Sequence, residues 1–469
     1  MVGGGRFAPV RTVTRLLLAA LLAVVLVPAL AAAQGVASPP DGTRVTHVPS
    51  VIRVSFPVSI EAALADARVI GPHGASSTSA RVPADDPQAL LIAVPSDGMG
   101  TYRAAWTVLT DDGHASSGST AFAVSVFAPA APAVVPRGGD GPGPLGVVAR
   151  LLMLIGVVGT AGMAVTRCWV VGAAWSAGGI ARPGGDDADR LRQRAASVMG
   201  APVRTWWRTW WALVACWSAG IVLALIGQAT DLGVGVGEVG TLLADSRWGH
   251  AWLVLLVLVA VATLAALLLR RGERPAQPGR AAMGMLAAPG LAAVLAMAWA
   301  GHASSGTDAT LGIALDTVHG WATALWLGGL LAVAVLAAPA LAALPADDRV
   351  RLGASVVVRF SALAVGAVVV LVVTGVYRAL AELPSLGALW TTSYGVALLV
   401  KLLIFVVMLG VGAWNRFVIH PRLERAALGL DPGGDAALAR LRVSVRAEVI
   451  LAVLVLVAVA VLVGIPPPS

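Results

Sequence analysis

Long apolar runs and short alternating runs divide this chain of 469 residues into two parts. From about residue 145 onward, eight apolar runs follow one another, each of roughly the twenty residues that a helix needs to cross a bilayer. They lie at about 145 to 167, 209 to 229, 249 to 269, 281 to 300, 313 to 338, 355 to 377, 394 to 415 and 447 to 464. The pattern predicts an all-α polytopic membrane domain of about eight helices over residues 145–469.

Before the first long run, the apolar stretches are short and alternate with polar positions. Residues 51–56, 90–94, 102–108 and 120–126 each have the length and alternation of a β-strand, and turn signals separate them. We therefore expect an all-β, immunoglobulin-like sandwich over residues 34–127. Residues 128–144 are rich in Pro, Gly and Ala and are predicted to form a linker.

The N-terminus has the layout of a cleaved secretory signal. Arg6, Arg11 and Arg15 come first, an apolar stretch at 16–30 follows, and three alanines end it, so residues 1–33 are predicted to be a signal peptide. With the sandwich outside, most arginines fall in cytoplasmic loops, and the outer loops keep only Arg247 and Arg378. Both signals predict a multi-pass protein whose sandwich and C-terminus are extracytoplasmic.

Composition narrows the function classes. The chain is 58% hydrophobic and 12% charged, which is typical of an integral membrane protein rather than a soluble enzyme. Its net charge of +8 rests on arginines, most of which lie in short loops on one side of the predicted membrane, so we expect no nucleic-acid partner. Cys168 and Cys216 lie in or beside predicted spans and imply no disulfide framework. The chain shows neither a nucleophile with its base nor an ATP-binding loop, so neither an enzyme nor an ATP-driven pump is predicted.

Six of the seven histidines fall on the predicted outer side, which favours a metal site there. In the sandwich, Asp112 and His114 flank a glycine, so a tight turn can aim a carboxylate and an imidazole at one ion. Oxygen with imidazole suits Cu(II). The alternative is an Asx-type turn with an exposed histidine.

In the membrane half, His250, His302 and His319 lie near the outer ends of three successive spans. Asp316 is three residues before His319 and shares its helix face, so the carboxylate can ligate a metal or orient the imidazole. Each histidine alone is equally compatible with a hydrogen-bonded interfacial role. The set beside Asp316 favours a metal site, because ionisable groups at membrane depth are usually functional.

The inner half of the helices offers sulfur atoms. They belong to Cys168, Cys216, Met283 and Met285. Thiolate and thioether ligands select Cu(I), but ordinary helix packing is the favoured interpretation of these residues.

These residues also carry a family resemblance. Residues 38–42, 100–106, 111–114 and 118–122 resemble the CopC copper-binding domain. Residues 319–329, 359–361, 374–378 and 389–395, with Lys401, Asn415 and Arg416, resemble CopD, in the order of CopC–CopD fusions. The resemblance implies copper binding outside and copper import across a bacterial cell membrane. Its partners would be the copper ion, the lipid bilayer and an extracytoplasmic copper donor protein.

The resemblance implies Cu(II) at the sandwich and Cu(I) or Cu(II) in the membrane domain. It matches Asp112 and His114 to Cu(II) ligands. CopC proteins usually begin, after signal cleavage, with a histidine that completes this site, whereas residues 31–36 here read Ala-Ala-Ala-Gln-Gly-Val. We therefore expect weak Cu(II) binding, unless His47 or His73 substitutes.

Two other functions remain open. A b-type cytochrome would ligate haem between His302 and His319, and a Soret band would reveal it. A copper-sensing or storage module would hold copper outside without moving it, and copper flux into vesicles would separate it from a transporter.

The topology is tested with reporters. A phosphatase that is active only outside the cytoplasm, fused after Ser469, is expected to be active because eight spans return the chain to its starting side. The same phosphatase inserted near residue 275, in an arginine-rich loop, serves as the inactive control. An inactive fusion after Ser469 with an active one at 275 would reverse the orientation.

Overall fold

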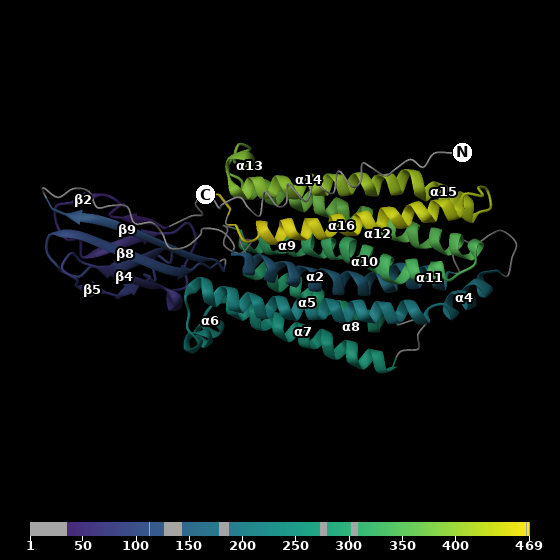
Figure 1. Ribbon diagram of the computed structural model, residues 1–469, viewed down its shortest axis with the longest axis horizontal. Helices are drawn as coiled ribbons and strands as arrows, with labels where there is room; N and C mark the ends of the chain where they lie inside the picture. The colour runs from purple at the N-terminus through teal and green to yellow at the C-terminus, as the bar shows by residue number, and fades with distance from the viewer. Residues whose placement is uncertain are drawn as a thin grey trace.

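The computed structural model describes residues 35–111, 113–125, 143–177, 187–272, 279–301, 308–465 and 467–468. The predicted signal peptide and residues 128–142 of the predicted linker lie outside these ranges. In the described part, a β-sheet domain is followed by long helices that pack side by side (Figure 1). The predicted fold class is confirmed for both parts.

The β domain is a sandwich of two sheets. One sheet has the order β1 (Val36–Ser38), β3 (Val51–Ser55), β7 (Ala89–Ala93), β6 (Ala80–Arg81). The other has the order β2 (Arg44–Val45), β9 (Ala115–Val124), β8 (Gly100–Leu109), β4 (Asp66–Ile70), β5 (Ser76–Ser77). Alternate residues such as Ile52, Val54, Trp106 and Phe122 form the core between the sheets, as the period of two along a strand requires.

In the ranges that the structure describes, eight helices are long and apolar enough to cross a membrane, which agrees with the expected number. They are α2 (Pro144–Thr166) with the π-helical turn η2 (Arg167–Gly172) and α3 (Ala173–Ser176); α5 (Gly200–Leu232); α7 (Arg247–Gly272); α8 (Arg280–Ala300); α9 (Ala309–Thr323), continued by η5 (Ala324–Gly328), α10 (Gly329–Ala332), η6 (Val333–Ala337) and α11 (Ala338–Ala342); α12 (Ala346–Glu382); α14 (Ser393–Trp414) with η7 (Asn415–Ile419) and α15 (His420–Ala427); and α16 (Gly434–Leu462). The shorter elements are η1 (Ala62–Leu64), α4 (Asp187–Ser197), η3 (Val236–Glu238), α6 (Val239–Asp245) and α13 (Ala388–Thr391).

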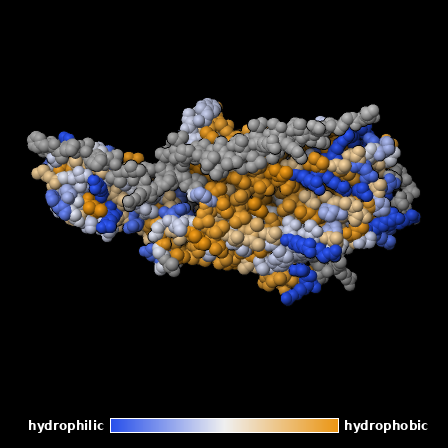
Figure 2. Space-filling model, in the orientation of Figure 1, coloured by the Kyte–Doolittle hydropathy of each residue, from blue (hydrophilic) through white to orange (hydrophobic). Residues whose placement is uncertain are grey.

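The surface of the helices carries an apolar belt (Figure 2). Leu264 on α7, Val373 on α12 and Val406 on α14 are among its exposed side chains. Hydrophilic side chains gather at the end of the bundle away from the sandwich (Figure 2). The last turn of α16 lies at the sandwich end (Figure 1). This surface suits a multi-pass membrane protein, with the belt facing acyl chains.

Helix α2 is the centre of the bundle and touches α5, α8, η5, α10 and α16. Glycines line its contacts. A Cβ at Gly162 would overlap the carbonyl oxygen of Ala324, and one at Gly156 would lie 2.7 Å from the carbonyl oxygen of Leu213. Without side chains at these positions, the backbones of α2, α5 and η5 come into direct contact, as small residues allow in membrane helices.

This contact gives a stability prediction. Gly162→Val is expected to lower the free energy of unfolding by about 3 kcal/mol or more, because rigid backbone must move to admit the side chain. Gly366→Val, on α12 where nothing lies within 4 Å of the added Cβ, is the matched control and should keep wild-type stability. Thermal unfolding in detergent measures both. Equal midpoints for the two variants would contradict the close contact.

Candidate metal sites

The first candidate site is the turn that joins β8 to β9. The amide and the hydroxyl of Thr110 each donate to the carbonyl oxygen of His114 at 2.8 Å, and the hydroxyl accepts from the His114 amide at 3.2 Å. Gly113 takes a φ of 83°, in the left-handed region where glycine is preferred. The predicted tight turn is therefore present, with His114 half-buried on it. Asp112 lies outside the described residues.

Neither substitute histidine is near this turn. Strand β8 has ten residues and is about 30 Å long. His73 bonds through Nδ1 to the carbonyl oxygen of Asp97 at 2.6 Å, next to the start of β8, whereas His114 follows its end. His47 follows β2, which pairs with the same far end of the sheet. The sheet thus holds both side chains a strand length away from His114.

The first described residues pair with the end of β3. Val36 pairs with Ser55, and the chain continues from there to Ile60, which bridges to Thr110. Gly35 packs against Phe56.

The same turn is seated on the outer end of the helices. Gln228 of α5 donates its amide to the carbonyl oxygen of Gly113 at 3.2 Å, and a Cβ on Gly113 would lie 2.9 Å from Trp248 of α7. Arg247 makes two further contacts between the helices and the sandwich. Its backbone amide donates to Glu61 at 3.0 Å, and its guanidinium lies 3.4 Å from Asp111. The turn that carries His114 therefore packs against the helices.

The second candidate site lies on α9. His319 Nδ1 is 2.8 Å from the hydroxyl of Thr374 on α12, and that hydroxyl donates its hydrogen to the carbonyl oxygen of Val370 at 2.7 Å. The bond between Nδ1 and the Thr374 hydroxyl orients the imidazole ring, and it leaves Nε2 as the ring nitrogen that can meet a metal.

Asp316, one turn before His319, takes part in an ion-pair network. Its carboxylate is 2.9 Å from Nε of Arg378, which also binds Glu382. Tyr394 donates its hydroxyl to Glu382, and Lys401 is attracted to both carboxylates. Two cations thus face two anions in the outer part of the bundle. Ligation of a metal by Asp316 requires its pair with Arg378 to open.

His250 does not lie beside His319, although the sequence placed both in one candidate set. Its exposed imidazole bonds through Nε2 to the carbonyl oxygen of Ala244 at 2.7 Å and closes the connection between α6 and α7. Helix α7 packs on α5, α6 and α8, whereas α9 packs on α8 and α12, so α8 lies between His250 and His319. His302 lies outside the described residues.

Within the ranges that the structure describes, no three His, Cys, Asp or Glu side chains come close enough together to hold one metal ion. The sulfur-containing side chains of the predicted inner half fit the interpretation that they are ordinary packing residues. Met283 is buried in the core of the bundle and Cys168 packs against that core, while Met285 is exposed. The described geometry thus keeps His114 and His319 apart: hydrogen bonds hold the backbone of His114 in its turn and the ring of His319 against Thr374.

Comparison with known proteins agrees with this two-part architecture. The family model of copper resistance protein D matches residues 354–462, and that of the CopC domain matches residues 36–125. Copper resistance protein D of Pseudomonas syringae pv. tomato is 32% identical over 225 residues, which cover 46% of this chain and 67% of that protein. This chain belongs to the CopD family and carries a CopC domain.

Other relatives are similar over smaller parts. Copper transport protein CutJ of Bacillus subtilis (strain 168) is 30% identical over 41% of this chain and 34% of that protein. Among solved structures, CopC from Methylosinus trichosporium OB3b is 28% identical over 19% of this chain and 88% of its own, with a TM-score of 0.18. PcoC, a copper resistance protein from Escherichia coli, is 22% identical over 19% of this chain and 95% of its own, with a TM-score of 0.17. These family memberships support a copper-related, non-enzymatic role.

Sequence reasoning had not assigned several polar residues of the CopD helices to a site. Thr374, Arg378 and Tyr394 lie in the motifs that carry the resemblance, but only the structure joins them to His319 and Asp316. Glu448 had not been singled out. Its place inside a predicted span was the signal available for Glu448, because charged residues are rare at membrane depth.

The CopC turn gives a binding prediction. A fragment of residues 34–126 is expected to bind Cu(II) more weakly than CopC proteins with an amino-terminal histidine, and His114→Ala should weaken it further, by at least about tenfold. Competition titration measures both. His73→Ala is the matched control and should leave the affinity unchanged. Tight binding that survives His114→Ala would show that the ligands were assigned wrongly.

Proposed function

We propose that this protein imports copper across the cell membrane, with the CopC domain capturing the ion outside and the CopD helices passing it inward. The proposal rests on one observation: the turn that carries His114 packs against α5 and α7. Copper released from this turn meets the outer end of the helices directly. The proposal also agrees with the relatives named for copper resistance and copper transport.

The next ligand inward is His319. It lies ten residues into α9, about 15 Å from the outer end of that helix. The hydrogen bond to Thr374 occupies Nδ1 of His319, so Nε2 is the ring nitrogen that would ligate copper. Asp316 offers a carboxylate one turn nearer the outer end, once Arg378 shifts to Glu382 alone.

The stretch between the turn and α9 contains His302, which we propose as the intermediate ligand. Gly113 approaches the carbonyl oxygen of Ala300, since a Cβ there would lie 3.6 Å away. His302 follows Ala300 by two positions in the sequence. In this proposal copper passes from His114 to His302 and then to His319, and an extracytoplasmic donor protein would load His114.

The import proposal is tested in cells that express the protein under limiting copper. His319→Ala and His302→Ala are expected to abolish copper accumulation, because the remaining partners are left without the cation that offsets their desolvation. Thr374→Val should reduce accumulation less, since it removes only the bond that orients the ring. His114→Ala should raise the copper concentration required.

Copper content at matched expression measures these effects. His250→Ala is the control, because this exposed imidazole only closes the α6–α7 connection, and should accumulate copper normally. Equal accumulation by wild type and His319→Ala would remove His319 from the path. Equal accumulation by the wild type and by cells without the protein would overturn import itself.

A further inference from the structure

A buried carboxyl group at the inner end of the bundle belongs to neither candidate metal site. Glu448 on α16 is 4% exposed and accepts a hydrogen bond from the carboxamide nitrogen of Asn415. The carboxamide oxygen of Asn415 is itself buried, and it has no hydrogen-bond partner in the described part of the chain. The side chains of Glu448 and Asn415 therefore meet at membrane depth, and the carboxamide oxygen of Asn415 accepts no hydrogen bond from the described residues.

Other carboxylates around the bundle have a cation beside them. Asp316 and Glu382 share Arg378, and Asp348 lies 2.9 Å from Arg194. Glu448 instead faces a neutral amide, and none of the described basic side chains forms an ion pair with it. Because a buried carboxylate is costly without a compensating positive charge, a proton or an incoming cation must supply it.

The helices around Glu448 do not supply that charge. Helix α16 packs against α2, α10, α12, α14, α15, η6 and η7. Elements α10 and η6 carry no charged residue, and α2 and α14 carry Arg150 and Lys401 toward their outer ends. The charged and titratable groups nearest this level are Arg359 on α12, Arg416 on η7, His420 and Glu424 on α15, and Arg442 and Arg446 on α16 itself; the others lie nearer the cytoplasmic ends.

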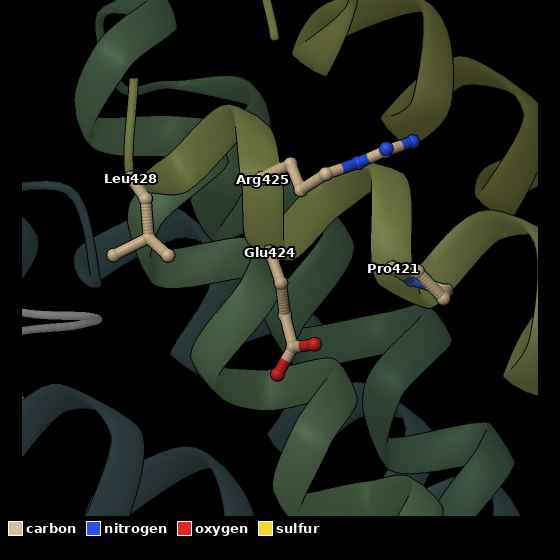
Figure 3. Close-up of a pocket in the computed structure, with 4 residues that line it drawn as sticks. All are labelled: Pro421, Glu424, Arg425 and Leu428. Carbon is tan, nitrogen blue, oxygen red and sulfur yellow. The ribbon is translucent and has the colours of Figure 1, made fainter. Parts of the chain in front are cut away.

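Three of these groups interact with one another. Nη1 of Arg416 lies 2.8 Å from Nδ1 of His420, and Nε2 of His420 lies 3.5 Å from Glu424. Glu424 lines a surface depression together with Pro421, Arg425 and Leu428, and its carboxylate points away from the side chain of Arg425 (Figure 3). Asn415 begins the π-helical turn η7, a type of backbone irregularity that is frequent at functional sites.

We propose that Glu448 and Asn415 form a protonation site at the inner end of the bundle, and that Glu448 releases its proton when a copper cation enters the inner half. The proton leaves on the side of Arg446, an exposed residue two positions before Glu448. The resulting carboxylate offsets one positive charge of the entering cation, and no electron is transferred. This coupling rests on the proposed import function, and in it each copper ion that enters the inner half displaces one proton from Glu448.

The experiment is copper-minus-apo infrared difference spectroscopy on the full-length protein in detergent, with Cu(I) kept reduced by ascorbate. The wild type is expected to lose a protonated-carboxyl band on copper binding. Glu448→Gln should bind copper at the outer sites but lack this loss, and Glu448→Asp should retain it at a shifted frequency. Glu424→Gln, which alters a half-exposed carboxylate at the same end, is the matched control and should behave as wild type.

The outcomes separate the two proposals. A carboxyl loss of wild-type size in Glu448→Gln, or none in copper-loaded wild type, would overturn the protonation site. A pH titration of the apo protein tests this site without copper, because its carboxyl band must titrate and disappear in Glu448→Gln. Loss of the band on copper binding without copper uptake into vesicles would retain the protonation site and reject import.

Discussion

The bundle depends on backbone-to-backbone contact along α2. In a membrane, lipid tails are as apolar as the side chains between helices, so association relies on close packing. Gly156 and Gly220 bring α2 and α5 together, and Gly162 with Gly328 does the same for α2 and η5. Contact with η5 fixes the span that contains α9. The position of His319 therefore follows from glycines that carry no chemistry of their own.

The two ends of the helical bundle differ in whether their buried carboxylates have a positively charged partner. At the outer end, Arg378 and Lys401 balance Asp316 and Glu382, so the carboxylates are compensated within the protein. At the inner end, Glu448 has an amide for a partner and depends on a mobile cation or a proton. A cation that moves from one end to the other passes from a compensated environment to one that lacks a positive charge.

The CopC domain adds a constraint of its own. Its β8–β9 turn performs two tasks, because it carries His114 and also meets Gln228, Arg247 and Trp248 of the helices. Arg247 takes up the carboxylates of Glu61 and Asp111 near the same turn, which leaves fewer oxygen ligands for copper.

The sequence by itself determined the elements and predicted their sidedness. Apolar runs of bilayer length predicted the eight spans, alternation predicted the sandwich, and short motifs predicted the CopC and CopD families, because these features depend on neighbours within about twenty residues. Tertiary structure alone decided which side chains meet. Thr374 lies 55 positions from His319, and Asn415 lies 33 from Glu448. The helix that separates His250 from His319, and the strand length that separates His73 from His114, are likewise products of packing and register, which no local pattern encodes.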